Sequence, residues 1–197
     1  MSPAEQTGVL PGPDGKPRCW WALSSPEYVE YHDDVWGRPL HGEPELFERL
    51  TLEAFQSGLS WLTILRKREN FRRAFDAFDI DRVAAYGEPE VERLLGDAGI
   101  IRNRRKIEAT ISNARAAREL HANGETLDEV IWSFAPDAGS RAAPETGADI
   151  AATTAESTAM AKELKRRGFV FVGPTTAYAT MQAAGLVNDH LAGCAFR

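Results

Sequence analysis

Apolar side chains recur at helical spacing through most of this 197-residue chain, and this periodicity constrains its fold more than any other feature. Leu46, Leu50 and Ala54, for example, share one face of a helix expected at 44–57. The only strand candidate, at 169–172, is too isolated to make a sheet. The sequence therefore predicts an all-α fold.

Local start and stop signals set the expected helix boundaries. Ser25 and Pro26 are an N-cap and a first-turn proline for a helix that ends before Gly37. The helices expected after it cover 44–57, 60–78, 79–86, 89–96, 103–122, 157–167 and 174–184. The Pro- and Gly-rich residues 1–18 are expected to form a disordered N-terminal tail, and 19–197 a single domain.

Composition is typical of a globular protein and gives no sign of a membrane protein. No apolar run approaches the roughly 20 residues of a membrane helix, and no signal segment begins the chain, so we expect a cytoplasmic protein. The net charge of -6 argues against a nucleic-acid partner, yet more than half of the basic residues lie at 66–73, 102–106 and 162–167. These runs form either one basic face on an acidic body or three unrelated solvated helix faces.

Glu53 lies at the border of the apolar stripe of helix 44–57, where an unpaired carboxylate costs several kcal/mol. The aromatic residues expected near it are Trp20, Trp21, Tyr28, Tyr31 and Trp61. Such a set suits a flipped, cationic purine, because the rings stack on its faces and the carboxylate accepts from its exocyclic amine. A guanine carbonyl would face a second acceptor at a cost of about 1–3 kcal/mol, so Glu53 would select adenine. Alternatively, Glu53 pairs with Arg66 or Arg68 and the rings are core.

Two cysteines and two histidines lie near opposite ends of the chain: Cys19 and His32, then His190 and Cys194. They would complete a tetrahedral zinc shell that is closed, and therefore structural, because all four ligands come from the protein. His190 and Cys194 share one face if their segment is helical, whereas the spacing of the first pair differs from that of ordinary zinc fingers. The alternative is a buried cysteine, a core histidine and two surface residues.

A helix, a hairpin containing Gly99 and a second helix are expected at about 89–122. Backbone N–H groups at such a turn and at the start of the second helix can bind a phosphate. Arg102, Arg104 and Lys106 would supply positive charge beside them. A hairpin of two packed helices without any DNA role is the alternative.

Six sequence blocks, taken together and in order, resemble the DNA-3-methyladenine glycosylase I family. They are R-C-W-W at 18–21, Y-x-x-Y-H-D-x-x-W-G at 28–37, L-E-A-F-Q-S-G-L-S-W at 52–61, D-A-G-I-I-R-N-R-R-K-I at 97–107, G-F-V-F-V-G at 168–173 and G-L-V-N-D-H-L-A-G-C at 185–194. The resemblance covers 19–194. Ala54-Phe55 and Trp20 depart from the family pattern, which bears on the shape of the pocket.

The resemblance implies a helix-hairpin-helix DNA glycosylase fold with a structural zinc ion that joins the two ends of the chain. By position, it assigns zinc to Cys19, His32, His190 and Cys194, the catalytic, adenine-reading role to Glu53, the pocket to Trp21, Tyr28, Tyr31 and Trp61, and DNA binding to Gly99, Arg102, Asn103, Arg104 and Lys106. It further implies a monomeric, monofunctional enzyme that excises 3-methyladenine from double-stranded DNA.

The expected chemistry is undemanding, because methylation at N3 makes adenine a cationic and therefore good leaving group. Related glycosylases often carry an Asp after the hairpin, but 103–127 contains none, so we expect modest catalysis confined to labile alkylated bases. Three alternatives are a glycosylase/lyase with Lys106 as nucleophile, a non-catalytic structure-specific DNA-binding protein, and a helical scaffold without a DNA role.

Overall fold

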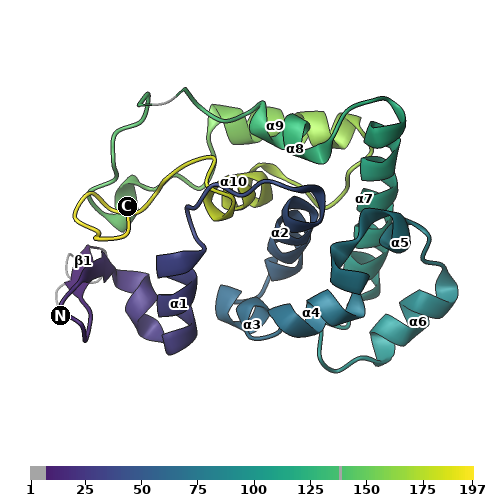
Figure 1. The fold of residues 1–197 in the computed structure, drawn as a ribbon, viewed down its shortest axis with the longest axis horizontal. Helices are drawn as coiled ribbons and strands as arrows, with labels where there is room; N and C mark the ends of the chain where they lie inside the picture. The colour runs from purple at the N-terminus through teal and green to yellow at the C-terminus, as the bar shows by residue number, and fades with distance from the viewer. Residues whose placement is uncertain (1–7, 138) are drawn as a thin grey trace.

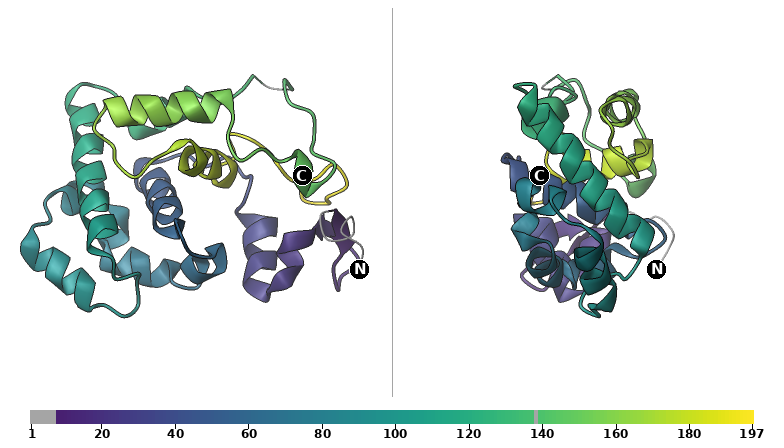
Figure 2. Two further views of the ribbon diagram at one scale, coloured as in Figure 1. Left: turned by 180° about the vertical axis from the view of Figure 1, so that it is seen from behind. Right: turned by 90° about the vertical axis from the view of Figure 1, so that its right-hand side faces the viewer.

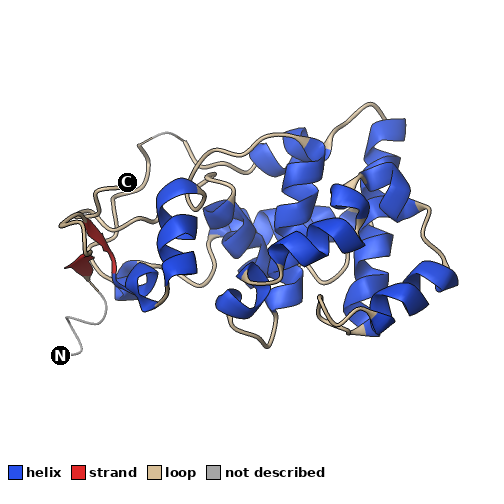
Figure 3. Ribbon diagram, turned by 60° about the horizontal axis from the view of Figure 1, so that its bottom comes forward, coloured by secondary structure: helices blue, strands red, loops and turns tan. Residues whose placement is uncertain are grey.

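The computed structural model describes residues 8–137 and 139–197, and most of these residues are helical (Figures 1 and 3). The α-helices are α1 (Pro26–Asp34), α2 (Glu43–Gln56), α3 (Trp61–Leu65), α4 (Arg68–Ala74), α5 (Ile80–Ala84), α6 (Glu88–Gly96), α7 (Arg104–Ala122), α8 (Leu127–Trp132), α9 (Ala155–Arg166) and α10 (Pro174–Ala183). The remaining elements are the strands β1 (Val9–Pro11) and β2 (Pro17–Cys19) and the 3-10 helices η1 (Trp20–Ser24), η2 (Asp76–Phe78) and η3 (Gly147–Asp149). Within the described ranges, no helix combines the length and the apolar run needed to cross a bilayer.

The N-terminal region departs from the sequence prediction, because β1 and β2 form an antiparallel hairpin in which Val9 pairs with Cys19. The expectation that ordered structure begins at Cys19 is therefore wrong for 8–18, whereas residues 1–7 of the predicted tail lie outside the described residues. Arg18 explains the difference. Its buried guanidinium is bound by Asp14 at 2.6 Å and Asp33 at 2.7 Å, and a hydrophobic pattern does not reveal such ion pairs.

Helix α2 lies at the centre of the fold, because its residues from Leu46 to Phe55 are all buried. It contacts α3, α5, α7, α8 and α10 (Figure 1). An amphipathic helix on a surface would bury only its apolar stripe. Since α2 is enclosed on several sides, Glu53 at the border of that stripe is buried as well.

The predicted helix at 60–78 is divided into α3, α4 and η2, and α8 was not predicted. The chain turns sharply after α4, where Asp76, Ala77 and Phe78 have positive φ angles of 50°, 55° and 59°. This turn buries Phe75 and Phe78 with their ring centroids 5.7 Å apart. The aromatic packing offsets the backbone strain, which costs about 1–3 kcal/mol per residue.

The C-terminal segment returns to the N-terminal hairpin (Figures 1 and 2). The Ala195 backbone N–H donates to the Pro17 carbonyl at 2.9 Å, and Leu191 packs in one buried cluster with Cys19 and Cys194. The strand candidate at 169–172 is an irregular connection between α9 and α10. The N-terminal hairpin and the C-terminal segment therefore meet next to η1, which packs against α1.

Candidate active site

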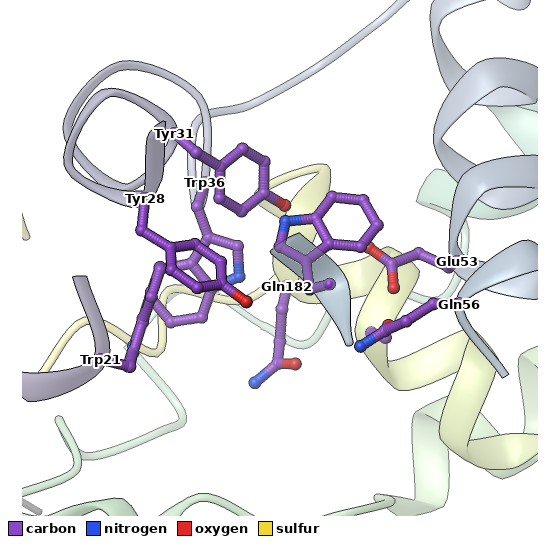
Figure 4. Close-up of a pocket in the computed structure, with 9 residues that line it drawn as sticks. Trp21, Tyr28, Tyr31, Trp36, Glu53, Gln56 and Gln182 are labelled. Carbon is purple, nitrogen blue, oxygen red and sulfur yellow. The ribbon is translucent and has the colours of Figure 1, made fainter. Parts of the chain in front are cut away.

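An aromatic cavity of about 300 Å³ is bounded by η1, α1, α2, α3 and α10 (Figure 4). The residues that line it are Trp21, Tyr28, Tyr31, Trp36, Glu53, Gln56, Trp61, Ala179 and Gln182. Glu53, Trp21, Tyr28, Tyr31 and Trp61, which the resemblance assigned to the base pocket, are all among them, whereas Trp20, also expected near Glu53, does not line the cavity. In Figure 4, Trp21, Tyr28 and Tyr31 lie across the cavity from Glu53.

The aromatic walls are held by contacts between elements. The ring centroids of Trp21 and Tyr28 lie 5.6 Å apart in an edge-to-face pair, and those of Tyr31 and Trp61 lie 5.3 Å apart. The Tyr28 hydroxyl accepts a hydrogen bond from the Leu62 N–H at 3.0 Å, which ties α1 to the start of α3. The rings are thus in place before a ligand arrives, and their faces favour a flat, cationic one.

Glu53 supplies the buried carboxyl group of this cavity, with only 6% of the residue exposed. Burial raises its pKa to about 8, and the nearby charge of Arg49 acts in the opposite direction. A carboxyl group with so perturbed a pKa inside a cavity is typical of a functional site.

The alternative in which Glu53 forms an ion pair with a neighbouring arginine is wrong. Arg66 pairs instead with Glu27 at 2.8 Å, and Arg68 pairs with Glu48 at 2.5 Å. The carboxyl oxygens of Glu53 therefore face the cavity without a basic partner among the residues that the structure describes.

Three polar or aromatic residues of the cavity were missed from sequence: Trp36, Gln56 and Gln182. Gln56 follows Glu53 by three positions on α2, and this spacing could have indicated it. Gln182 comes from α10, where no local signal marks it. Its Nε2 donates to the buried carboxylate of Asp189 at 2.9 Å, which turns its carbonyl oxygen away from Asp189.

The four predicted metal ligands form a second, buried cluster, with one ligand atom of each within 4.8 Å of all the others. His190 Nδ1 lies 3.1 Å from His32 Nε2 and 3.5 Å from Cys194 Sγ, and Cys19 Sγ lies 4.0 Å from His190 Nδ1. The segment that carries His190 and Cys194 is a turn and not a helix, so their approach does not depend on the helical geometry considered from sequence.

Hydrogen bonds around the cluster indicate that it fits a metal ion. His32 Nδ1 lies 2.7 Å from Asp33 Oδ1, and His190 Nε2 lies 3.0 Å from the Trp36 carbonyl. Both partners are acceptors, so these ring nitrogens donate, and in neutral rings the two nitrogens that face the cluster are unprotonated. Two lone pairs 3.1 Å apart repel each other unless a cation lies between them.

The cluster also supports one wall of the cavity. The Trp21 ring packs edge-on against His32, with centroids 5.1 Å apart, and Trp36 packs in the same way against His190 at 4.7 Å. Because both tryptophans line the cavity, the positions of His32 and His190 bear directly on its shape.

The predicted hairpin connects α6 to α7. The Gly99 N–H donates to Asp97 Oδ1 at 2.7 Å, and the Gly99 carbonyl accepts from Lys67 and Asn70. The Asn103 side chain caps α7 by accepting from the Lys106 N–H at 3.2 Å. These bonds fix the turn that the sequence predicted as a phosphate site.

The basic side chains of the hairpin differ in their availability. Arg104 pairs with Glu88 at 2.9 Å and with Glu108 at 3.3 Å. The Lys106 ammonium donates to the Phe55 and Ser57 carbonyls at the end of α2, at 2.9 and 2.6 Å. Of the basic residues at 102–106, Arg102 and Arg105 are thus the exposed ones without an ion pair to another described residue.

Comparisons with known proteins show which family the chain resembles. A family model described as "Methyladenine glycosylase" matches residues 21–197. The DNA-3-methyladenine glycosylase 1 of Escherichia coli strain K12 is 49% identical over 177 residues, which are 90% of this chain and 95% of the relative. A crystal structure of 3-methyladenine DNA glycosylase I matches with a TM-score of 0.87 at 49% identity and covers 90% of this chain and 98% of the other. A variant of an enzyme of that name, solved in complex with 3-methyladenine, matches with a TM-score of 0.82 at 34% identity over 89% and 94% of the two chains.

Proposed function

The chain belongs to the methyladenine glycosylase family, and from this premise we propose that it removes 3-methyladenine from alkylated DNA by hydrolysing the N-glycosidic bond. The product is an abasic site. The observation that carries the proposal is the buried carboxyl group of Glu53 inside an aromatic cavity, where it forms no ion pair with any arginine that the structure describes. A relative solved with 3-methyladenine supports the same ligand class.

Base recognition follows from the two kinds of group in the cavity. The rings of Tyr31 and Trp61 stack on the flipped purine, and Glu53 accepts a hydrogen bond from its exocyclic amine. Guanine would present a carbonyl oxygen to that carboxylate and leave two acceptors facing each other, at a cost of about 1–3 kcal/mol. Adenine is thereby selected over guanine.

The charge of the substrate and the ionisation of Glu53 favour each other. Burial raises the pKa of Glu53 to about 8, so the empty cavity favours its neutral form at pH 7. A cationic base in the same cavity stabilises the carboxylate, and the carboxylate stabilises the cation. An uncharged, undamaged adenine lacks this term of attraction and is bound less well.

Catalysis needs little beyond binding, because the methylated base is already a good leaving group. The cavity holds the flipped base while water attacks the oxocarbenium-like sugar. Residues 103–127 contain no aspartate that would stabilise a sugar cation. The reaction is therefore confined to bases whose glycosidic bond is weakened by alkylation.

Zinc is the metal that best suits the cluster, held by Cys19, His32, His190 and Cys194. When bound, it supplies a structural cross-link and no reactive position, because the protein provides all four ligands. The ligand residues themselves hold η1 and α1 against the C-terminal segment and set the positions of Trp21 and Trp36.

DNA is held by α6, the hairpin and α7, which together serve as a helix-hairpin-helix element. The backbone N–H groups at the start of α7 and the exposed Arg102 contact the phosphates of a duplex. Gly99 and Asn103 shape the turn. Arg104 and Lys106 stabilise the segments next to it, because Arg104 pairs with Glu88 and Lys106 donates to the Ser57 carbonyl. We expect a monomer to suffice, because one chain carries both the cavity and the hairpin.

The test is to incubate the purified protein with methylated duplex DNA and to identify the released bases by mass spectrometry. We expect 3-methyladenine as the main product, and a rate at least roughly tenfold lower for Glu53→Gln with the fold intact by circular dichroism. Release of no alkylated base by the wild-type protein, or wild-type rates for Glu53→Gln, would overturn the assignment.

A further inference from the structure

The large hydrophobic residues most exposed in the described part of the chain are Leu59, Val170 and Phe171, at 39%, 41% and 41%. They lie on both sides of the start of α7. On one side, Lys106 of α7 donates to the carbonyl of Ser57, two residues before Leu59. On the other, the Arg105 guanidinium lies 5.8 Å from the centroid of the Phe171 ring. Two distant segments thus present apolar side chains beside one helix end.

The exposure of Val170 and Phe171 is built into the fold. The buried side chain of Asn113 accepts from the Val170 N–H at 2.8 Å and donates to the Val170 carbonyl at 3.1 Å. Phe171 has a φ of 58°, which is strained for a bulky residue. Its neighbours Phe169 and Val172 are buried at 2% and 8%, so the strained turn points two apolar side chains outward while the flanking ones stay in the core.

Unpaired positive charge surrounds this turn. A hollow of about 700 Å³ beside Phe171 is lined by Lys162 and Lys165 from α9. Both lysines are exposed and, like Arg105, form no ion pair with any residue in 8–137 or 139–197. The next arginine along α9, Arg166, is instead neutralised by Glu163 at 2.6 Å.

We propose that Val170 and Phe171, with Lys162 and Lys165, form a second DNA contact that grips the duplex next to the damaged nucleotide. The lysines contact phosphates, and Phe171 packs against sugars and base edges in the minor groove, where apolar side chains commonly insert. Charge complementarity and continuity with the start of α7 favour DNA over a protein partner. This proposal rests on the proposed function and adds to it a surface outside the base cavity.

The test measures binding to a duplex that carries a stable abasic analogue, by fluorescence anisotropy between 50 and 200 mM salt. Lys162→Glu with Lys165→Glu is expected to weaken binding roughly tenfold or more and to reduce the slope of log K against log salt by about 1.8. The second variant is Phe171→Asn, because asparagine tolerates the positive φ angle at this position. It is expected to weaken binding roughly tenfold and to leave the slope of log K against log salt unchanged.

The matched control is the double variant Lys16→Glu with Arg82→Glu. It changes the net charge by the same amount as the lysine variant, but at the N-terminal hairpin and on α5. Binding of free 3-methyladenine, followed by tryptophan fluorescence, is expected to stay unchanged in all of these variants. DNA affinities of the Lys162, Lys165 and Phe171 variants equal to that of the control would overturn the proposal. Failure of the wild-type protein to release 3-methyladenine would instead overturn the proposed function, so the two failures are distinguishable.

Discussion

Arg49 lies one helical turn before Glu53 on α2, and its buried guanidinium is the nearby charge that opposes the effect of burial on the pKa of Glu53. The Nε and Nη1 atoms of Arg49 have no hydrogen-bond partner among the described residues. A buried guanidinium with two nitrogen atoms that lack hydrogen-bond partners costs several kcal/mol. Because Arg49 lies beside the cavity carboxyl, we infer that its positive charge is kept there to stabilise the Glu53 carboxylate.

Replacement of Arg49 by Met tests this relationship. We expect the pKa of Glu53 to rise above about 8, because the positive charge that favours the carboxylate is lost. Each unit by which this pKa rises lowers the ionised fraction of Glu53 about tenfold at neutral pH, so excision at pH 7 should fall in proportion and recover at higher pH. Single-turnover rates from pH 5 to 9 measure it, with Arg82→Met, at an exposed position of α5, as the control. An unchanged pH profile would contradict the prediction.

Glu53 should also make stability depend on pH. Its pKa is about 8 in the folded protein and near 4.5 when unfolded, so its stabilising contribution is full below about 4.5 and is lost as the pH rises through 8. Relative to Glu53→Gln, the wild-type protein should lose about 2–4 kcal/mol of unfolding free energy between pH 5 and pH 8. Urea denaturation at several pH values measures this difference, and Glu30→Gln on the surface of α1 controls for the loss of one carboxylate. Parallel stability curves for wild type and Glu53→Gln would rule it out.

Disruption of the proposed zinc site should weaken base binding as well as stability. Cys19→Ser or Cys194→Ser is expected to lower bound zinc from one equivalent to well below it and to reduce the melting temperature by several degrees. Since His32 and His190 support Trp21 and Trp36, affinity for free 3-methyladenine should fall in the same variants. Elemental analysis and tryptophan fluorescence measure the two effects, and His41→Gln outside the cluster is the control. Full zinc content in the cysteine variants would argue against the ligand assignment.

Asp189 should act on the cavity through Gln182. A carboxylate only accepts hydrogen bonds, so Asp189 fixes which end of the Gln182 amide faces it, whereas Asn at 189 could either donate or accept. Asp189→Asn and Gln182→Met should each lower kcat/KM for excision roughly tenfold, and the double variant should lose little more than either one. Zinc content is measured alongside because Asp189 precedes His190. Additive losses in the double variant would contradict a shared role.

Much of the site could be predicted from the sequence because its signals are local. The stripe of Leu46, Leu50 and Ala54 predicted α2, and a carboxylate at the border of that stripe made Glu53 a candidate, to which the family resemblance then assigned the base-reading role. Four of the five aromatic residues of the cavity, all but Trp36, and the four Cys and His residues were likewise indicated by residue type and spacing, and the structure brings each set together.

Other features were decided by contacts between residues far apart in the chain. The hairpin of 8–19 depends on ion pairs that bury Arg18, which a hydrophobic pattern does not report. Gln182 enters the cavity because α10 packs on α2, and Lys106 is held by the end of α2. Sequence periodicity determines which face of a helix is apolar, whereas the enclosure of α2 on several sides, and with it the raised pKa of Glu53, exists only once the later helices have packed around it.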